Sequence, residues 1–343
     1  MKKVIVTGGA GFIGSHTVVE LVAAGYEPVI VDDLRNSDER TLQGLASIIG
    51  RTPTLHRIDC TDEAAFDSVF RTEGHIYGVI HFAAYKAVGE SVAEPVKYYA
   101  NNLGSLAVLL KLMDRYAVKR LVFSSSCTVY GQPLELPVSE RSPDGRASSP
   151  YGFTKVACEQ LLRDLSVADG TMRSVLLRYF NPIGAHPSGL IGELPIGVPN
   201  NLVPYVTQTA MGKRERLTIN GNDYATPDGT CVRDYIHVVD LAKAHVEALH
   251  WLDQQKGGAC EVFNLGTGKG NTVLEVVNAF EEVTGVKVPH VIGPRRAGDV
   301  ESVYAETTKS RTVLGWSCKQ DLRDALRDAW KWELALAGNT VSH

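Results

Sequence analysis

The stretch that decides the fold is residues 3–14, which read KVIVTGGAGFIG. A short β-branched run, Val4–Val6, leads into a glycine-rich turn, and an amphipathic helical pattern follows. Gly8, Gly11 and Gly14 recur at every third position. This spacing provides a tight turn, close approach of backbone amides to a pyrophosphate, and close packing of helix on strand. The sequence therefore predicts a dinucleotide-binding strand, turn and helix.

An acidic residue after the next apolar run strengthens this prediction. Asp32 directly follows Val29–Val31, where a carboxylate can accept hydrogen bonds from the ribose hydroxyls of adenosine. The same carboxylate would repel the 2'-phosphate of NADP, so the sequence favours NAD. Arg35 lies close enough in the chain to leave NADP as an alternative.

Short β-branched runs alternate with helical periodicity through the first half of the chain. This alternation is typical of βαβ units and predicts an α/β fold, a Rossmann-type doubly wound parallel sheet with helices on both faces. The expected strands are 4–6, 29–31, 79–82, 121–123 and 175–177. The expected helices are 13–24, 62–70, 103–116 and 155–167.

The character of the sequence changes after Asn181. Prolines and glycines are frequent over residues 182–204, which predicts a loop-rich segment that lines a site. Later elements, read as a smaller C-terminal α/β substrate domain, are helices at 238–251, 273–283 and 322–332 and a strand at 261–264. The expected division is an NAD-binding Rossmann domain over 1–180 and a mainly substrate-binding domain over 181–343, with chain crossovers between the two.

Composition narrows the range of functions. Of the 343 residues, 44% are hydrophobic and 22% charged, as in an ordinary globular protein, and the net charge of -4 provides no basic field for nucleic acid. The six cysteines are scattered without a CxxC pair or zinc-type spacing, which favours reduced thiols in a cytoplasmic protein and predicts no metal site. No run of about 18 apolar residues occurs, so no membrane span is expected.

Tyr151 and Lys155 stand four residues apart at the start of an expected helix, so both side chains project from one face. Ser124–Ser126 follow an expected strand, at the carboxyl edge of the sheet where ligands bind. A tyrosine with a pKa of ~10 needs a shift of about 3 units to act as a base near pH 7. Lys155, the nicotinamide charge and the helix-start amides together can supply it. The alternative, a surface Tyr-Lys pair, is disfavoured by the surrounding motifs.

Together, the turn 7–14, the serines 124–126 and the segment Tyr151–Lys155 resemble the extended short-chain dehydrogenase/reductase superfamily. Longer segments narrow the resemblance to the UDP-glucose 4-epimerases, over residues 3 to about 335. These segments are 86–91, 177–182, 199–202, 221–224, 233–238 and 295–299. The resemblance implies an NAD-dependent isomerase of galactose metabolism, which inverts C4 of UDP-hexoses through a 4-keto intermediate.

The resemblance also implies a role for each matching residue. Tyr151 takes the proton of the sugar 4-hydroxyl, Ser126 bridges the sugar oxygen and the phenol, and Lys155 supports the phenolate. The family's NAD contacts fall on Gly8, Gly11, Phe12, Ile13, Gly14, Asp32, Asn36, Ser37, Asp59, Cys60, Phe82, Ala83, Ala84, Lys86, Asn101, Ser124, Tyr151, Lys155 and Phe180. Its UDP-sugar contacts fall on Lys86, Ser126, Tyr151, Asn181, Asn201, Leu202, Thr218, Asn220, Arg233, Arg296, Asp299 and Val303.

Two further expectations come from the resemblance. Arg233 and Arg296 suit the diphosphate through charge-assisted hydrogen bonds, and the alternative for them is a surface ion pair. Members of the family are usually homodimers, often through helices such as those expected at 103–116 and 155–167. We therefore expect a homodimer here.

Two positions depart from the family's pattern. Cys127 stands where we expect alanine and could suggest a thiol nucleophile, but no base is paired with it in sequence, so small-residue packing is preferred. Val303 falls where family members restricted to UDP-glucose and UDP-galactose carry tyrosine. The smaller side chain leaves room for a 2-acetamido group, which predicts UDP-GlcNAc and UDP-GalNAc as additional substrates.

Two other functions are weighed against an epimerase. A nucleotide-sugar 4,6-dehydratase typically carries an Asp-Glu pair just after the Ser/Thr position, but here Cys127 and Thr128 follow Ser126. A catalytically inactive NAD-binding sensor is disfavoured because Ser126, Tyr151 and Lys155 are all present. Both stay as alternatives that an activity assay can separate.

Two local patterns resemble other sites. Residues 264–270 invite a P-loop interpretation, but no Ser or Thr follows Lys269, so a strand-to-helix turn with Thr272 capping the next helix is favoured. His237 and Asp240 could be imagined as a dyad or as metal ligands. A turn entering the following helix explains them better, because no third ligand lies nearby in sequence.

Overall fold

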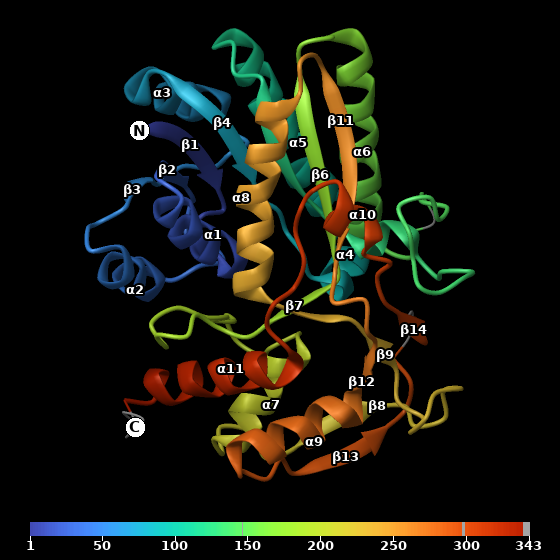
Figure 1. Cartoon of the computed structure of the whole chain (residues 1–343). Helices are drawn as coiled ribbons and strands as arrows, with labels where there is room; N and C mark the ends of the chain where they lie inside the picture. The colour runs from blue at the N-terminus through green and yellow to red at the C-terminus, as the bar shows by residue number, and fades with distance from the viewer. Residues whose placement is uncertain (146, 297–298, 339–343) are drawn as a thin grey trace.

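The computed structural model describes residues 1–145, 147–296 and 299–338. Its largest unit is a parallel seven-stranded sheet in the order β11-β6-β5-β4-β1-β2-β3 (Figure 1). The strands are β1 (Lys2–Thr7), β2 (Tyr26–Val31), β3 (Thr54–His56), β4 (Ile76–His81), β5 (Arg120–Ser126), β6 (Arg173–Tyr179) and β11 (Ala259–Leu265). The strand order reverses between β1 and β4, which creates the switch point where such sheets bind ligands. The expected Rossmann-type fold is confirmed.

Helices cover both faces of this sheet, and alternation along β1 shows how. Val4 and Val6 join the core formed with α1 and α8, whereas Ile5 joins the core formed with α3, α5 and α6. The helices are α1 (Phe12–Ala23), α2 (Glu39–Ile49), α3 (Glu63–Glu73), α4 (Val88–Ala93), α5 (Pro95–Arg115), α6 (Pro150–Ala168) and α8 (Val238–Gln254). The strands read as near-continuous apolar runs because both faces are buried.

One late helix and one late strand return to the large sheet. β11 pairs in parallel with β6 along its whole length, and α8 packs against α1. Both elements form within the range 181–343, but they lie on the main sheet, and the sequence predicts chain crossovers without assigning them to particular elements. Local periodicity shows the type of an element but not its partner, so it could not place these two.

The other C-terminal elements form a smaller unit around a core of their own, below the main sheet in Figure 1. Val206, Phe280 and Leu326 bring α7, α9 and α11 together in this core. β8 pairs with β13, β9 pairs with β12 and β14, and β7 pairs with β10. The bounds are β7 (Asn181–Ile183), α7 (Leu202–Ala210), β8 (Leu217–Asn220), β9 (Val232–Arg233), β10 (Tyr235–His237), β12 (Asn271–Thr272), α9 (Val273–Thr284), β13 (His290–Gly293), β14 (Ser302–Val303) and α11 (Leu322–Leu336). The short helix α10 (Thr308–Thr312) instead packs against β11 of the main sheet.

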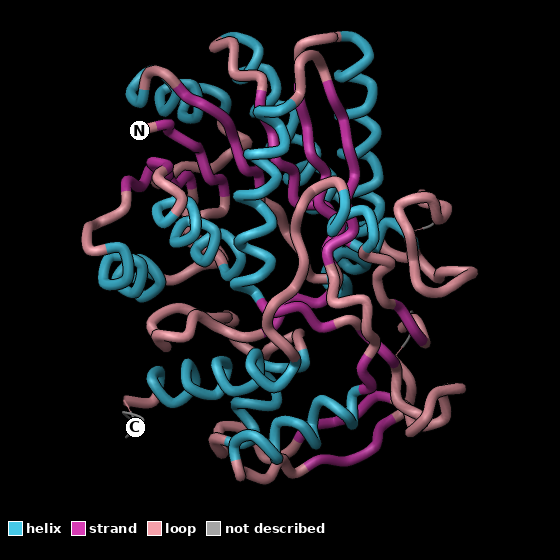
Figure 2. Tube along the Cα trace, viewed as in Figure 1, coloured by secondary structure: helices cyan, strands magenta, loops and turns pink. Residues whose placement is uncertain are grey.

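The segment between β7 and α7 is loop throughout, as its prolines and glycines predict (Figure 2). It places residues 184–201 between the two units. Over the described ranges, no helix is long and apolar enough to cross a bilayer. The same ranges contain no group of three His, Cys, Asp or Glu side chains arranged to hold a metal ion.

Candidate active site

The glycine turn is shaped by contacts that a side chain would destroy. Gly8 has a φ of 69°, and a Cβ there would lie 2.9 Å from the backbone nitrogen of Ala83. A Cβ at Gly14 would lie 2.2 Å from the carbonyl oxygen of Gly8. Gly11 caps α1 without a side-chain hydrogen bond, so the first amides of the helix, from Phe12 onward, are left to bind an anion. The turn therefore fits the pyrophosphate of a dinucleotide.

Asp32 stands at the end of β2 beside this turn. Its carboxylate accepts hydrogen bonds from Ala10 N at 3.0 Å, Leu34 N at 2.9 Å and Ser37 Oγ at 2.9 Å. Burial raises the pKa of Asp32, and these hydrogen bonds act in the opposite direction. The carboxylate is thus fixed by backbone amides at the place where ribose hydroxyls are expected.

Arg35, the residue that left NADP as an alternative cofactor, already contacts other side chains of the protein. Its guanidinium contacts the carboxylates of Asp33 and Asp59 and donates to the Tyr85 hydroxyl at 2.8 Å. Two carboxylates on one guanidinium leave little positive charge to attract a 2'-phosphate. The geometry favours NAD.

The other expected NAD contacts lie along the same edge of the sheet. The Phe82 amide donates to Thr7 O at 3.0 Å, and the Ala83 amide donates to Thr7 Oγ1 at 3.3 Å, so the chain leaving β4 is held against β1. Asn101 on α5 donates to the Asn102 side chain at 3.0 Å. Of the other expected NAD contacts, Ile13 lies in the first turn of α1. Asn36, Cys60, Ala84 and Lys86 lie in the segments that follow β2, β3 and β4.

The expected catalytic residues meet where β5 ends and α6 begins. Ser149 caps α6 by accepting from Gly152 N at 3.1 Å, which sets the first turn of the helix with Tyr151 on it. Lys155 Nζ donates to the Ser124 carbonyl at 2.7 Å and lies 6.0 Å from the centroid of the Tyr151 ring. Ser126, the last residue of β5, accepts hydrogen bonds from Thr128 N at 3.2 Å and Thr128 Oγ1 at 3.0 Å, and its hydroxyl acts to lower the pKa of the Tyr151 phenol. Ser126, Tyr151 and Lys155 are all buried.

The electrostatics of these groups differ from the expectation in one respect. Burial raises the pKa of Tyr151 to about 12, and the Ser126 hydroxyl acts in the opposite direction. Burial lowers the pKa of Lys155 to about 8, while Cys158 and Glu159 act to raise it. Burial of Tyr151 therefore opposes the lowering of its pKa that is expected from Lys155, the helix-start amides and the nicotinamide charge.

The two expected diphosphate arginines share one carboxylate. Asp299 Oδ1 lies 2.7 Å from Arg296 Nη2 and 3.6 Å from Arg233 Nη2. Arg233 also donates to Val232 O at 2.8 Å. Asp299 orients both guanidinium groups and leaves most of their hydrogen-bond donors for another anion. The surface ion-pair alternative describes Arg296, which is 62% exposed, better than Arg233, which is 14% exposed.

Val303 lies in a small apolar cluster with expected cofactor and catalytic neighbours. It is buried with Phe180, and Cys127 packs against the same cluster. Burial raises the pKa of Cys127 to about 12, so its thiol stays protonated and packing is its role in this structure. Val303 lies in β14 and pairs with Arg233 on β9, so two of the expected UDP-sugar contacts are neighbours in one small sheet.

The other expected substrate residues lie on the smaller unit. Asn181 in β7 donates its amide to Asp234 O at 2.9 Å, and Asn201 and Leu202 stand at the start of α7. Thr218 and Asn220 lie on β8, which pairs with β13. Within the described residues, no hydrogen bond or ion pair joins these two β8 side chains to the arginines.

Glu193 is a residue of this region that sequence reasoning missed. Its Oε1 accepts from Asn201 Nδ2 at 2.6 Å and lies 3.6 Å from Lys86 Nζ. Two expected substrate contacts from different units are thus joined by one carboxylate. Nothing in the sequence marks Glu193, because it lies in a loop without periodicity.

The patterns that resembled other sites have structural roles. Asp234 accepts from the Thr267 amide at 2.8 Å and the Gly268 amide at 3.1 Å, which shapes the turn that resembled a P-loop. Thr272 forms a capping box at the start of α9, as predicted. His237 caps α8, and Asp240 accepts from the amides of residues 319 and 320.

Comparison with known proteins identifies the family. The chain is 54% identical over 331 residues to the UDP-glucose 4-epimerase of Dictyostelium discoideum. The aligned residues cover 96% of this chain and 95% of that protein. It is 53% identical to the enzyme of that name from Bacillus subtilis (strain 168), over 96% of each chain. The crystal structure of UDP-glucose 4-epimerase from Bifidobacterium longum in complex with NAD+ and UDP superposes with a TM-score of 0.94 at 48% identity, over 99% of this chain and 100% of that one. Residues 4–266 match the NAD dependent epimerase/dehydratase family, and the chain belongs to that family, among its UDP-glucose 4-epimerases.

Proposed function

We propose that this protein is an NAD-dependent isomerase that inverts C4 of UDP-hexoses and interconverts UDP-glucose and UDP-galactose through a 4-keto intermediate. The observation that carries the proposal is the convergence of Ser126, Tyr151 and Lys155 at the carboxyl edge of β5, beside the glycine turn. The same edge collects the residues proposed to hold NAD. Held by these residues, NAD would supply a reversible acceptor for the C4 hydride.

Each catalytic side chain has a task that its surroundings support. Tyr151 takes the 4-hydroxyl proton and returns it, Ser126 holds the sugar oxygen beside the phenol, and Lys155 stabilises the phenolate. Because the hydride returns to C4 and the proton returns to the oxygen on C4, the reaction has no net redox change. The cofactor is best held tightly, and the fixed Gly8–Gly14 turn and Asp32 support such retention.

The smaller unit is proposed to hold the UDP moiety, with residues 181–343 contributing most of its contacts. Arg233 and Arg296 bind the diphosphate, and Asp299 keeps both guanidinium groups in place. The keto sugar turns about the pyrophosphate link while the nucleotide stays bound. This turn exposes the other face of C4 to the cofactor.

The experiment that tests the proposal is an NMR assay of UDP-galactose without added NAD, with Tyr151→Phe as the control variant. UDP-glucose should form without net NADH in the wild type and be almost absent in the variant. A 4-keto-6-deoxy product would assign the protein to the dehydratases. No turnover would favour a binding protein.

A second substrate class is supported by Val303. The side chain is 7% exposed and lies in the cluster with Phe180, so a residue of larger volume there would reach the proposed sugar region. We propose that UDP-GlcNAc and UDP-GalNAc are also interconverted. Production of UDP-GlcNAc from UDP-GalNAc by the purified protein tests this.

We also propose a homodimer formed through α5 and α6. These helices pack side by side and carry exposed apolar side chains, among them Val96 at 79% and Phe153 at 46%. A molecular mass of one chain by light scattering at micromolar concentration would contradict the dimer.

A cytoplasmic location is proposed because the six cysteines are free thiols, as is usual in a reducing compartment. They are Cys60, Cys127, Cys158, Cys231, Cys260 and Cys318.

A further inference from the structure

A buried ion pair lies behind the serines of β5. Arg178 on β6 and Glu159 on α6 are each 1% exposed. The guanidinium holds the carboxylate through two parallel hydrogen bonds, Nε to Oε1 at 2.8 Å and Nη2 to Oε2 at 2.5 Å. A bidentate pair fixes both the distance and the orientation of its partners. Burial makes such a pair costly unless neighbouring groups satisfy its remaining hydrogen-bonding positions.

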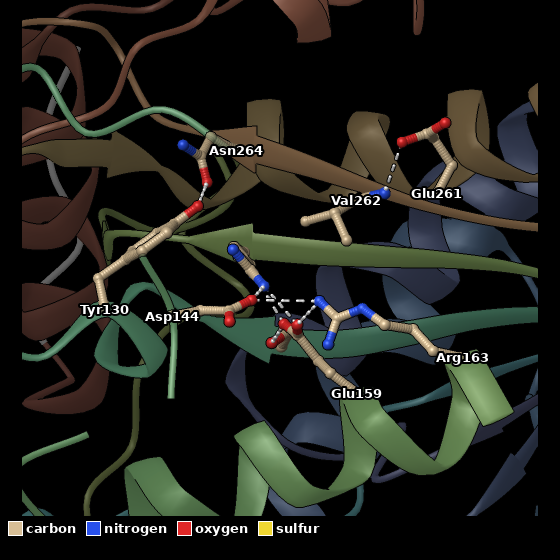
Figure 3. Close-up of polar contacts among 9 residues, drawn as sticks. Tyr130, Asp144, Glu159, Arg163, Glu261, Val262 and Asn264 are labelled. Atoms are coloured by element: carbon tan, nitrogen blue, oxygen red, sulfur yellow. Dashed lines mark hydrogen bonds and ion pairs between the residues drawn. The ribbon is translucent and has the colours of Figure 1, made fainter. Parts of the chain in front are cut away.

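Neighbouring residues do satisfy most of those positions. Ser125 donates to Glu159 Oε1, Arg163 donates to Oε2 at 2.8 Å, and Asp144 accepts from Arg178. Figure 3 shows Asp144, Glu159 and Arg163 converging, the last two from α6. The Tyr130 ring covers the Arg178 guanidinium, with its centroid 4.8 Å from Cζ. The network therefore ties β5, β6 and α6 together at one point.

That point lies one helical turn from the proposed reacting groups. Glu159 is four residues beyond Lys155 on α6, so the two side chains share a face of the helix. Ser125, which binds Glu159, stands between Ser124, whose carbonyl holds the Lys155 ammonium, and Ser126 of the catalytic set. A change in the position of Glu159 therefore moves α6 relative to the strand that carries the serines.

We propose that Glu159 is a positioning residue for the epimerisation, held by Arg178 and Ser125 so that it fixes the place and maintains the charge of Lys155. This inference rests on the proposed function. It adds a residue that contacts neither sugar nor cofactor and acts through Lys155.

Among the titratable groups around Lys155, Glu159 is the one that stabilises the charge of its ammonium. Burial lowers the pKa of Lys155 to about 8, while Cys158 and Glu159 act to raise it. The titratable groups that face the ammonium are Tyr151, Cys158 and Glu159 on α6 and His81 on β4. Burial raises the pKa of Cys158 to about 11 and lowers that of His81 to about 3, so both are neutral near pH 7. Among these described neighbours, Glu159 is the one carboxylate.

The pH dependence of kcat with UDP-galactose tests the proposal, with Glu159→Gln compared with the matched control Glu215→Gln. Loss of the Glu159 carboxylate lowers the pKa of Lys155, so the alkaline limb of kcat moves to lower pH by about 1 unit. Glu215 is 84% exposed and precedes β8 on the smaller unit, so its replacement should leave the limb in place. A folded Glu159→Gln enzyme with the alkaline limb of the wild type would overturn the proposal.

A second readout separates this proposal from the proposed function. In protein labelled with ¹³C at the lysine ε-carbon, the Lys155 signal is assigned by its loss in Lys155→Met, and its titration midpoint should fall in Glu159→Gln. This midpoint decides on Glu159 even if the wild type does not epimerise UDP-galactose. If the single variant unfolds because Arg178 keeps an unpaired buried charge, Glu159→Asp keeps both charges of the pair and withdraws the carboxylate by one methylene. A smaller fall of the midpoint in the same direction is expected there, and an unchanged midpoint would overturn the proposal.

Discussion

Replacing Arg233 by glutamine should weaken UDP-sugar binding far more than replacing Arg296 in the same way. Arg233 is 14% exposed and held by Val232 O and Asp299, whereas Arg296 is 62% exposed. A hydrogen bond to a charged group contributes about 1.5–3 kcal/mol, and each 1.4 kcal/mol is about tenfold in affinity. Loss of Arg233 should therefore raise KM roughly 10- to 150-fold. Solvent screens the exposed Arg296, so its loss should cost about tenfold or less.

The assay measures kcat and KM for UDP-galactose, together with the affinity for UDP by calorimetry. Because the diphosphate is remote from C4, KM should change more than kcat. Arg216→Gln is the control, since Arg216 is exposed and its guanidinium lies 3.8 Å from Glu215. A KM within twofold of the wild type in Arg233→Gln, with unchanged UDP affinity, would refute the assignment of Arg233 to the diphosphate.

Three further predictions concern the cofactor, the sugar and stability. Gly14→Ala places a Cβ 2.2 Å from Gly8 O, so the purified variant should contain little NAD. Chromatography of the nucleotide released from the protein measures this content. The control Gly170→Ala, which has open space around its Cβ, should contain as much NAD as the wild type. Val303→Tyr should abolish turnover of UDP-GalNAc and retain that of UDP-galactose, and equal retention of both activities would contradict the account. Burial lowers the pKa of His81 to about 3, so below about pH 6.5 the unfolded chain binds a proton that the folded chain does not. The free energy of unfolding should then fall on acidification by about 1.4 kcal/mol per pH unit for this residue, and urea unfolding at pH 7 and 5.5 should show a smaller difference in His81→Asn.

The part of the site that could be predicted from sequence depends on residues close together in the chain. The spacing of Gly8, Gly11 and Gly14 by itself indicates a tight turn that brings backbone amides close to a pyrophosphate. Tyr151 and Lys155 share a helix face because they stand four residues apart. The type of most elements was predictable for the same reason. The pairing of β11 with β6 was not, since it joins distant segments of the chain.

Residues that act through tertiary contacts were missed. Glu193 meets Lys86 and Asn201 only after the two units have packed. Glu159 and Arg178 look like ordinary charged residues of a helix and a strand until burial pairs them. The rise in the pKa of Tyr151 has the same origin, because desolvation depends on the surrounding fold and cannot be read from spacing.

In the proposed reaction, C4 loses and regains the same hydrogen while the nucleotide stays bound. This is tested by the turnover of UDP-galactose deuterated at C4, in ordinary water and with free NAD+ added, followed by mass spectrometry and NMR of the product. The UDP-glucose formed should retain the deuterium at C4. Replacement of the deuterium by hydrogen from solvent would contradict a hydride that is taken up and returned within one site.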